Sequence, residues 1–425
     1  MIEIITVSLF VIICLMAMFR SSWALALLVV LFPIKQALQA SSGFFLANYA
    51  LPNYIAAIVT MVSVLREVSK QQTPMLGYFS GSLLCTVVIF TWSAVSLMWT
   101  PSFASGSDFI TTNIPYFLLF ILLAPLLMRG MAEYRDFVVV LLWISSLVAI
   151  LILINPVFTS ESGRIGVQLA QGVRTNPLAI GELGGLLVLT AALFRSDPMP
   201  KLLVVIRVVG FISGTLLALQ SGSRGQILFA VTLAVIFFPV ASKVRNIRSF
   251  IGSVIGIATI GAVVGFLGLY LLEGYALRRW DADSLDDGIG VRLANLVDLF
   301  VSWLSNPSAW LIGLGFNAFT SLGSAQASLG YTHNLPIDIL TELGIPIFWV
   351  FLVFNLNIIQ SSRWLFAHFR EDSEYRPVVA TAIALVVYQF LLINKQGMLW
   401  GSPTYFMWCL LIIRTRHFEA TSRSD

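Results

Sequence analysis

The sequence predicts an all-α fold, a polytopic integral membrane protein with roughly 12 or 13 transmembrane helices and a long loop on the outer side. Of the 425 residues, 58% are hydrophobic and only 11% are charged, and the mean hydropathy is +0.89. Apolar segments of about 20 residues, the length that crosses about 30 Å of hydrocarbon as a helix, recur along the whole chain. No soluble domain of ordinary size fits between them, so residues 1–425 are expected to form a single transmembrane domain.

The expected spans follow the apolar segments in chain order, at residues 4–19, 23–40, 50–65, 80–98, 110–128, 137–154, 177–194, 202–219, 226–240, 250–272, 334–359, 377–393 and 403–413. The first and last segments leave the count open, because the first could act as an uncleaved signal anchor and the last is short. A cleavable signal peptide is not expected, since Glu3 interrupts the start and neither a basic n-region nor a small-residue cleavage site is present.

The three cysteines are expected to be packing residues. Cys14, Cys85 and Cys409 fall inside expected spans, far apart in the sequence, so neither a disulfide framework nor a CxxC metal or redox site is indicated. The formal charge of +4 is small for this length, and the basic residues are spread over loops. This distribution argues against a nucleic-acid partner and reports membrane topology instead.

Basic residues in short loops define the cytoplasmic side, because Lys and Arg in such loops stay inside. The loops that carry them alternate regularly along the chain and are completed by the C-terminal tail. These residues are Arg66, Lys70, Arg129, Arg135, Arg195, Lys201, Arg207, Lys243, Arg245, Arg248, Arg363, Arg370, Arg376, Arg414 and Arg416. The intervening loops are then expected on the outer side: residues 99–109, 155–176, 220–225, 273–332 and 394–402.

The outer side nevertheless holds arginines that the charge rule does not explain. They are Arg164, Arg174, Arg224, Arg278, Arg279 and Arg292. Solvation or snorkelling to lipid headgroups accounts for Arg164, Arg278 and Arg279 as well as a functional role does. For Arg224 a functional role is favoured, because its loop of six residues places the guanidinium at the membrane boundary, where ionisable groups are costly.

The stretch "SGSRGQ" around Arg224 suits an anion. Arginine donates bidentate hydrogen bonds to phosphate and keeps its charge in a low-dielectric setting, and lysine is nearly absent from the outer side. Ser221-Gly-Ser-Arg-Gly also combines small side chains with backbone N–H groups at a helix start, as anion cradles do. Two such arginines with one neutral histidine would suit a diphosphate leaving group and a hydroxyl nucleophile.

The sequence "HNLPIDILTELGI" predicts a helix that begins at the outer membrane surface. Asn334 is a good N-cap and Pro336 suits the first turn of the span expected at 334–359. The positive end of that helix disfavours imidazolium, so His333 would be a neutral imidazole that can accept a proton. The alternative for a lone histidine is a structural role.

Acidic residues of the outer side allow two interpretations. Asp338 and Glu342 lie four residues apart on one helix face in the outer half of the expected span, either contributing to a substrate site or pairing with arginines. Either way they imply a polar cavity. Asp281-Ala-Asp283 resembles acidic pairs that hold divalent cations, but arginines could neutralise a phosphate without an ion, so no metal site is expected.

Four segments in order resemble the bacterial O-antigen ligase and polymerase superfamily, whose enzymes act on undecaprenyl-diphosphate-linked glycans. They are "GVRTNPLAIGELGG", "SGSRGQ", "VRLANLVDLFVSWLSNPSAWLIGLGFNAF" and "HNLPIDILTELGI", and the resemblance covers residues 160–350. It implies a bundle of membrane helices with a partly helical periplasmic loop, and a multi-pass location in the bacterial inner membrane with the active site facing the periplasm.

The resemblance also implies residue roles. Arg224 and Arg292 would bind the diphosphate, and His333 would activate the acceptor hydroxyl in a metal-independent, inverting transfer that needs no cofactor. Arg174, Arg279, Asn334, Asp338 and Glu342 are further substrate-binding candidates. The expected partners are the undecaprenyl-diphosphate-linked glycan donor, a sugar or lipid A-core acceptor, membrane lipid and a chain-length regulator.

Two features of the sequence favour a polymerase over a ligase. The ligase pattern continues from Gly344 to a Gly, Thr or Tyr three residues later, where this chain has Ile347. Arg174 and Arg279 each begin a spacing of Arg, ten residues and Gly that resembles polymerase loops. An alternative from another class is a transporter or flippase for the same lipid-linked glycans, although the two similar halves that many carriers show are not seen in the sequence.

Overall fold

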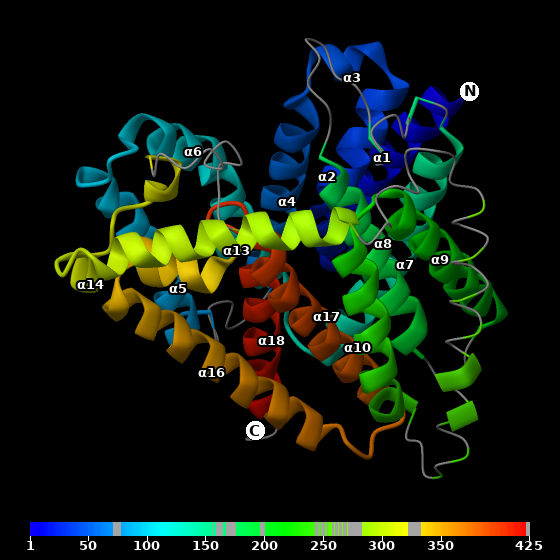
Figure 1. Ribbon diagram of the computed structural model, residues 1–425. Helices are drawn as coiled ribbons and strands as arrows, with labels where there is room; N and C mark the ends of the chain where they lie inside the picture. Colours follow the sequence, from blue (N-terminus) through cyan, green and yellow to red (C-terminus); the bar gives the residue numbers. More distant parts are fainter. Residues whose placement is uncertain are drawn as a thin grey trace. The chain divides into compact units, whose positions relative to one another are not determined.

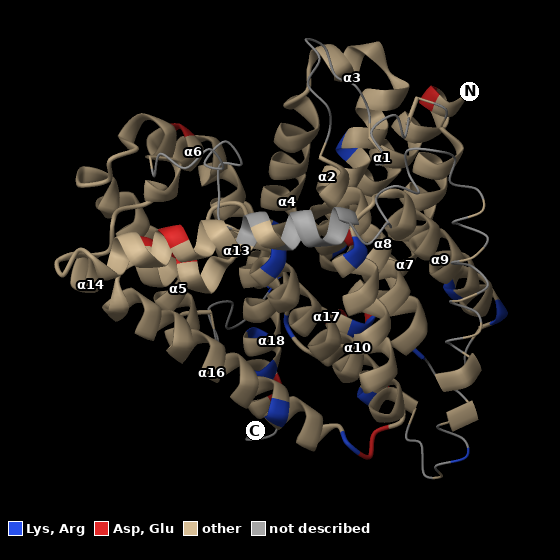
Figure 2. Ribbon diagram, viewed as in Figure 1, with Lys and Arg blue, Asp and Glu red and all other residues tan. Residues whose placement is uncertain are grey.

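The computed structural model covers the chain and describes residues 1–70, 78–155, 157–158, 165–166, 176–195, 200–242, isolated positions between 246 and 270, 283–321 and 333–421. The side chains of residues 283–289, 291 and 292 are outside this description. Within the described ranges every secondary-structure element is a helix. Ten of the helical segments are long and apolar enough to cross a membrane. Figure 2 shows long runs of these helices without a charged residue.

The ten segments are α1 (Ile2–Phe19), α2 (Ser21–Ser41), α4 (Leu51–Lys70), α5 (Gly81–Val95) with η1 (Ser96–Met98), α6 (Phe103–Tyr116) with η2 (Phe117–Leu123) and η3 (Ala124–Leu127), α7 (Met131–Ile154), α9 (Lys201–Gln220), α10 (Arg224–Ser242), α16 (Ile345–His368) and α17 (Tyr375–Gln396). The other helices are α3 (Gly43–Ala47), α8 (Pro177–Leu193), α13 (Asp283–Leu304), α14 (Ala309–Ile312), η5 (Ala318–Ser321), α15 (Leu335–Leu343) and α18 (Pro403–Thr421).

The chain divides into two compact units, each made of three sequence stretches. The first unit comprises Met1–Gln72, Leu127–Asp281 and Leu365–Tyr388, and the second comprises Thr73–Leu126, Ala282–Trp364 and Gln389–Asp425. Figure 1 colours the chain along its sequence, so the stretches of each unit can be followed there. Both units contain helices of membrane length, and the single transmembrane domain stays a prediction.

Close helix packing defines the core of the first unit. α2 is the most central of these helices, because α1, α4 and α7 contact it. Of its most apolar stretch, 78% is buried. The next layer is α8, which packs against α9 and α10. A Cβ at Gly184 of α8 would lie 2.6 Å from the Gly214 carbonyl oxygen of α9, so two glycines allow these backbones to approach.

The second unit is built around α5, α6, α18 and the helices that follow residue 282. α18 contacts α5 and η2, and α13 contacts both α14 and α15. In Figure 1, α13 (yellow-green) runs alongside α15 (gold). Hydrogen bonds from Trp92 to Leu343 and from Trp99 to Gly313 also join residues that are more than two hundred positions apart in the sequence.

Most expected spans are confirmed as helices, and one is corrected. The span expected at 334–359 is interrupted at Gly344, whose φ of +88° ends α15, and the membrane-length helix is instead α16, from Ile345 to His368. The segments expected at 177–194 and 403–413 form α8 and α18, which are not among the ten candidate spans.

Two parts of the expected topology are only partly described. The span at 250–272 lies mostly outside the described residues. The described part of the 273–332 loop contains α13, α14 and η5, as a partly helical loop requires. The total number of spans and the outer position of this loop stay predictions.

Candidate functional site

The turn that carries Arg224 connects α9 to α10 in the first unit. Ser221 and Ser223 are buried, Gly222 has a φ of +65°, and Arg224 is the half-buried first residue of α10. The positive φ explains the glycine, because L side chains rarely adopt it. Arg224 therefore lies where the first N–H groups of a helix have no partner within that helix, which adds to the positive potential of its guanidinium.

The start of α8 packs directly on this turn. Asn176 caps α8, because its Oδ1 accepts a hydrogen bond from the Leu178 N–H at 2.9 Å. Gln226 Nε2 donates to the Leu178 carbonyl oxygen at 2.9 Å. A Cβ at Gly181 would overlap both Gln226 Oε1 and Ser221 Oγ, so only glycine fits there. The segments "NPLAIGELGG" and "SGSRGQ" are therefore in contact.

Buried polar side chains from two further helices join them. Gln36 of α2 donates from Nε2 to the Asn176 carbonyl oxygen at 3.0 Å, and Tyr388 of α17 places its hydroxyl against Gly185. Among the described residues, Gln36 Oε1 and the Tyr388 hydroxyl have no hydrogen-bond partner, although their side chains are only 7% and 0% exposed. Unsatisfied buried polar atoms cost free energy, so these two atoms are unusual in the interior of an apolar helix bundle.

We call these residues the Arg224 cluster. It consists of Gln36, Asn176, Gly181, Ser221, Arg224, Gln226 and Tyr388, all within the first unit. Gln36, Gln226 and Tyr388 were not predicted from the sequence. The signal that could have indicated them is a polar side chain in an otherwise apolar helix, which is expensive in lipid and therefore calls for a polar neighbour.

The start of α15 in the second unit confirms the predicted cap. Asn334 Oδ1 accepts from the Ile337 N–H at 3.1 Å, and Pro336 lies in the first turn. His333 precedes the cap, is half-buried and has a φ of +68°. A left-handed conformation is uncommon for a residue with a side chain, and such strain clusters at functional sites.

Glu342 fastens a loop to α15. Its Oε2 accepts from the Asn317 N–H at 3.0 Å and its Oε1 accepts from the Phe319 N–H at 3.3 Å. Asn317 has a φ of +63°, so the carboxylate stabilises a strained turn. Burial raises the pKa of the Glu342 carboxyl to about 7, while the N–H groups act in the opposite direction. Asp338, one turn earlier, is also buried.

The same loop packs tightly through glycines. The Leu314 and Gly315 N–H groups donate to the Thr341 and Glu342 carbonyl oxygens, each at 2.9 Å. A Cβ at Gly313 would overlap the Glu342 carbonyl, and Gly313 and Gly315 have φ values of +79° and +95°. The segments "LIGLGFNAF" and "HNLPIDILTELGI" are therefore in contact. We call residues 313–321 the GLG loop.

Residues near position 100 hold the other side of the GLG loop. Ser96 Oγ accepts from the Phe316 N–H at 2.9 Å, and Thr100 Oγ1 donates to the Phe316 carbonyl oxygen at 2.8 Å. Trp99 Nε1 donates to the Gly313 carbonyl oxygen at 3.2 Å. These side-chain bonds satisfy loop backbone groups that no helix or strand pairs.

One polar residue on α13 was not predicted. Asn295 is fully buried on the face that also buries Leu299 and Trp303. Its Oδ1 and Nδ2 both have no hydrogen-bond partner in the part of the chain that the structure describes. Arg292 lies three positions earlier on the same helix. An asparagine inside an apolar helical stripe is the sequence signal that could have indicated it.

The predicted site residues are distributed between the units. Arg224 belongs to the first unit, whereas His333, Asn334, Asp338 and Glu342 belong to the second. The backbone of Arg292 lies in α13 of the second unit, and its side chain is outside the described part. Arg174, Arg279 and the Asp281 of the acidic pair lie outside the described residues.

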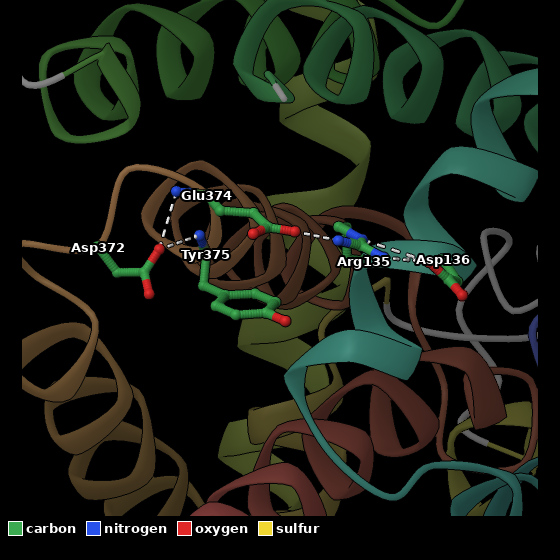
Figure 3. Close-up of polar contacts among 5 residues, drawn as sticks. All are labelled: Arg135, Asp136, Asp372, Glu374 and Tyr375. Carbon is green, nitrogen blue, oxygen red and sulfur yellow. Dashed lines mark hydrogen bonds and ion pairs between the residues drawn. The ribbon is translucent and has the colours of Figure 1, made fainter. Parts of the chain in front are cut away.

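Ion pairs gather the residues that the charge rule assigns to the cytoplasmic side. Glu67, near the end of α4, is buried. Its Oε1 lies 2.6 Å from Arg66 Nη2, and its Oε2 lies 3.4 Å from Arg129 Nη2. Figure 3 shows Arg135 of α7 between Asp136 and Glu374, which precedes α17.

Asp372 organises the start of α17 beside that pair. Its Oδ1 accepts from the Glu374 and Tyr375 N–H groups at 2.8 and 2.9 Å (Figure 3). The sequence had indicated only topology for the basic residues on this side. These contacts tie the end of α4 to the residues that precede α7, and α7 to the residue that precedes α17.

The apolar helices define a multi-pass membrane protein. The chain matches no protein-family model, and no curated protein matches it significantly. The resemblance to the ligase and polymerase superfamily therefore depends on the four motif segments and stays a prediction.

Proposed function

We propose that the protein is a glycosyltransferase of the bacterial inner membrane, which transfers a glycan from undecaprenyl diphosphate to an acceptor sugar hydroxyl at the periplasmic face. The observation that carries the proposal is the pairing of the four motif segments. "NPLAIGELGG" packs on "SGSRGQ", and "LIGLGFNAF" packs on "HNLPIDILTELGI", each pair by specific hydrogen bonds. Segments far apart in the sequence thus form two polar clusters in a largely apolar chain.

The chemistry assigns one role to each group. The acceptor hydroxyl oxygen attacks the anomeric carbon while the bond from that carbon to the phosphate oxygen breaks, and the diphosphate leaves with the electron pair. Arg224, at the start of α10, and Arg292 neutralise the leaving group. His333 takes the hydroxyl proton, and the configuration at the anomeric carbon inverts. A positioned base contributes about 10²- to 10⁴-fold to such a rate.

The acceptor distinguishes two forms of the same proposal. A polymerase adds the glycan to the terminal sugar of another lipid-linked repeat, with a chain-length regulator as partner, and a ligase adds it to a lipid A-core sugar. Ile347 in place of the ligase pattern's Gly, Thr or Tyr favours the polymerase. Arg174 and Arg279 would then contribute to substrate binding.

The experiment measures undecaprenyl diphosphate release by the purified full-length protein from a lipid-diphosphate glycan donor. His333→Asn is the sharpest variant, because asparagine tolerates the left-handed backbone of residue 333 but is not a base at neutral pH. We expect a loss of about 10²-fold or more. Unchanged release by this variant would exclude His333 as the base.

Arginine variants test the diphosphate site. Arg224→Ala should abolish release, and Arg224→Lys should restore only part of it, because a point charge lacks the guanidinium fork. Arg370→Ala is the matched control, since the Arg370 side chain is 73% exposed in a loop of the opposite predicted side. Full activity of Arg224→Ala would remove this residue from the site. Lipid movement across liposomes without any transfer would favour the flippase alternative.

A further inference from the structure

We propose that α13 and α14 lie along the membrane surface and insert an apolar stripe into the lipid interface. In α13 the stripe consists of Leu293, Val297, Phe300, Val301 and Leu304, which are 39% to 60% exposed. Their spacing of three and four residues places them on one side of the helix. The inference concerns how the chain meets the bilayer and does not depend on the proposed enzymatic activity.

The opposite side of α13 already has its partners. Asn295, Leu299 and Trp303 are buried, and Trp303 Nε1 donates to the Ala309 carbonyl oxygen at 2.9 Å. With 100° per residue, this buried face and the stripe point in opposite directions. α13 is therefore anchored on α14 and α15 by one face, and the described residues leave a second apolar face exposed.

In the second unit, α14, which follows α13, packs against the residue that precedes the membrane-length helix α16. Gly344 immediately precedes α16, and a Cβ there would overlap the Leu311 carbonyl and lie 2.9 Å from the Gly313 nitrogen. Leu311 of α14 is 67% exposed, and its neighbours Trp310 and Ile312 are 42% and 39% exposed. The exposed apolar side chains of α14 thus lie at the level of the first residues of α16.

The lipid-facing side of α16 continues from that level. Trp349, Val353 and Leu356 are 46% to 62% exposed and follow one helix face. A helix of this length and hydropathy meets lipid along that face. The stripe and the exposed side chains of α14 therefore adjoin a surface that hydrocarbon covers, and the bilayer is the occupant that fits them.

Tryptophan side chains lie near the start of α16, as is typical of the boundary between lipid and water. Trp92 Nε1 donates to the Leu343 carbonyl oxygen at 3.1 Å and Trp99 Nε1 donates to the Gly313 carbonyl oxygen at 3.2 Å. Trp310 of α14 is 42% exposed and packs its ring against that of Trp303, at a centroid distance of 6.3 Å. Indole rings gather where the apolar core of a bilayer meets water, because they combine a large apolar body with one N–H donor.

Length and polarity support a helix that lies in the surface rather than across it, because the apolar part of α13, Leu293–Leu304, is shorter than a membrane span. Between residues 293 and 312 the only charged residue is Asp298, which is exposed and lies beside the stripe. Farther along, the exposed Ser305 and Asn306 end the helix. A helix with an apolar face, a buried face and a polar edge is suited to lie in the plane of the interface.

The test uses spin labels on the full-length protein in nanodiscs of phosphatidylethanolamine and phosphatidylglycerol. After Cys14, Cys85 and Cys409 are replaced by serine, single cysteines are introduced by Val297→Cys or Leu304→Cys, with Asp298→Cys as the control on the same helix. Collisions with oxygen, which concentrates in lipid, are compared with collisions with a water-soluble nickel chelate. We expect an oxygen-to-nickel ratio several-fold higher at 297 and 304 than at 298.

Two outcomes would overturn the proposal. Oxygen-to-nickel ratios at 297 and 304 as low as that of a water-exposed label would place the stripe in water, and low collision rates with both reagents at 297 and 304 would show a protein surface covering it. A second measurement avoids the cysteine background: brominated lipids should quench wild-type tryptophan fluorescence more than that of Trp310→Phe. If the two proteins are quenched alike, Trp310 does not meet lipid.

Discussion

Replacing Glu342 by glutamine tests how the GLG loop is held. Each carboxylate oxygen accepts a different backbone N–H, from Asn317 at 3.0 Å and from Phe319 at 3.3 Å. A glutamine has one oxygen and one NH₂ group, so in either orientation one loop N–H faces another donor. The substitution keeps the size of the side chain, which isolates the hydrogen bonds from packing.

The expected loss is set by one buried donor without an acceptor. Glu342 is 6% exposed, so water does not replace the lost oxygen, and such a group costs about 1–3 kcal/mol. In a domain of roughly 150–250 residues each kcal/mol lowers the melting temperature by about 2–4 °C. We therefore expect Glu342→Gln to melt several degrees below the wild-type protein.

The assay is thermal unfolding of the purified protein in detergent, combined with hydrogen exchange of the GLG loop. Glu371→Gln is the matched control, because the Glu371 side chain is 76% exposed and lies 4.0 Å from Arg370. Surface changes of that kind stay within about 0.5 kcal/mol. An unchanged melting temperature with unchanged exchange of residues 313–321 in Glu342→Gln would refute the reasoning.

Three further predictions concern contacts in the two units. Gly185→Ala should lower stability by about 1–3 kcal/mol, because its Cβ would overlap the Tyr388 hydroxyl, and Tyr388→Phe should restore part of this loss in a thermal melt. Asn295→Leu should leave the stability equal or higher, since an unsatisfied buried amide is removed. A role of this amide in substrate binding would show as reduced glycan transfer by the same variant. Reduced stability would contradict the unpartnered state of the amide. Arg135→Ala with Glu374→Ala should give a coupling free energy below about 1 kcal/mol in a double-mutant cycle, because both side chains are partly exposed; a coupling of several kcal/mol would contradict this.

Features that depend on neighbours in sequence were predicted well. The cap formed by Asn334, the glycine-containing turn before Arg224 and most helix positions follow from short-range patterns. The interruption at Gly344 was missed, because an apolar run that contains one glycine resembles a continuous span. Its cause is the close approach of the backbone at Leu311, which no local pattern reports.

By itself the sequence determined that the protein is helical, that it crosses the membrane many times, and which arginines the charge rule leaves unexplained. These properties are local, because periodicity, capping and hydropathy depend on residues within a few turns of one another. Only the tertiary structure decided that Glu342 holds the backbone at Asn317, that Gln226 bonds the start of α8, and that Trp92 reaches Leu343. These contacts join residues 25, 48 and 251 positions apart, and the packing of whole helices sets which distant groups meet.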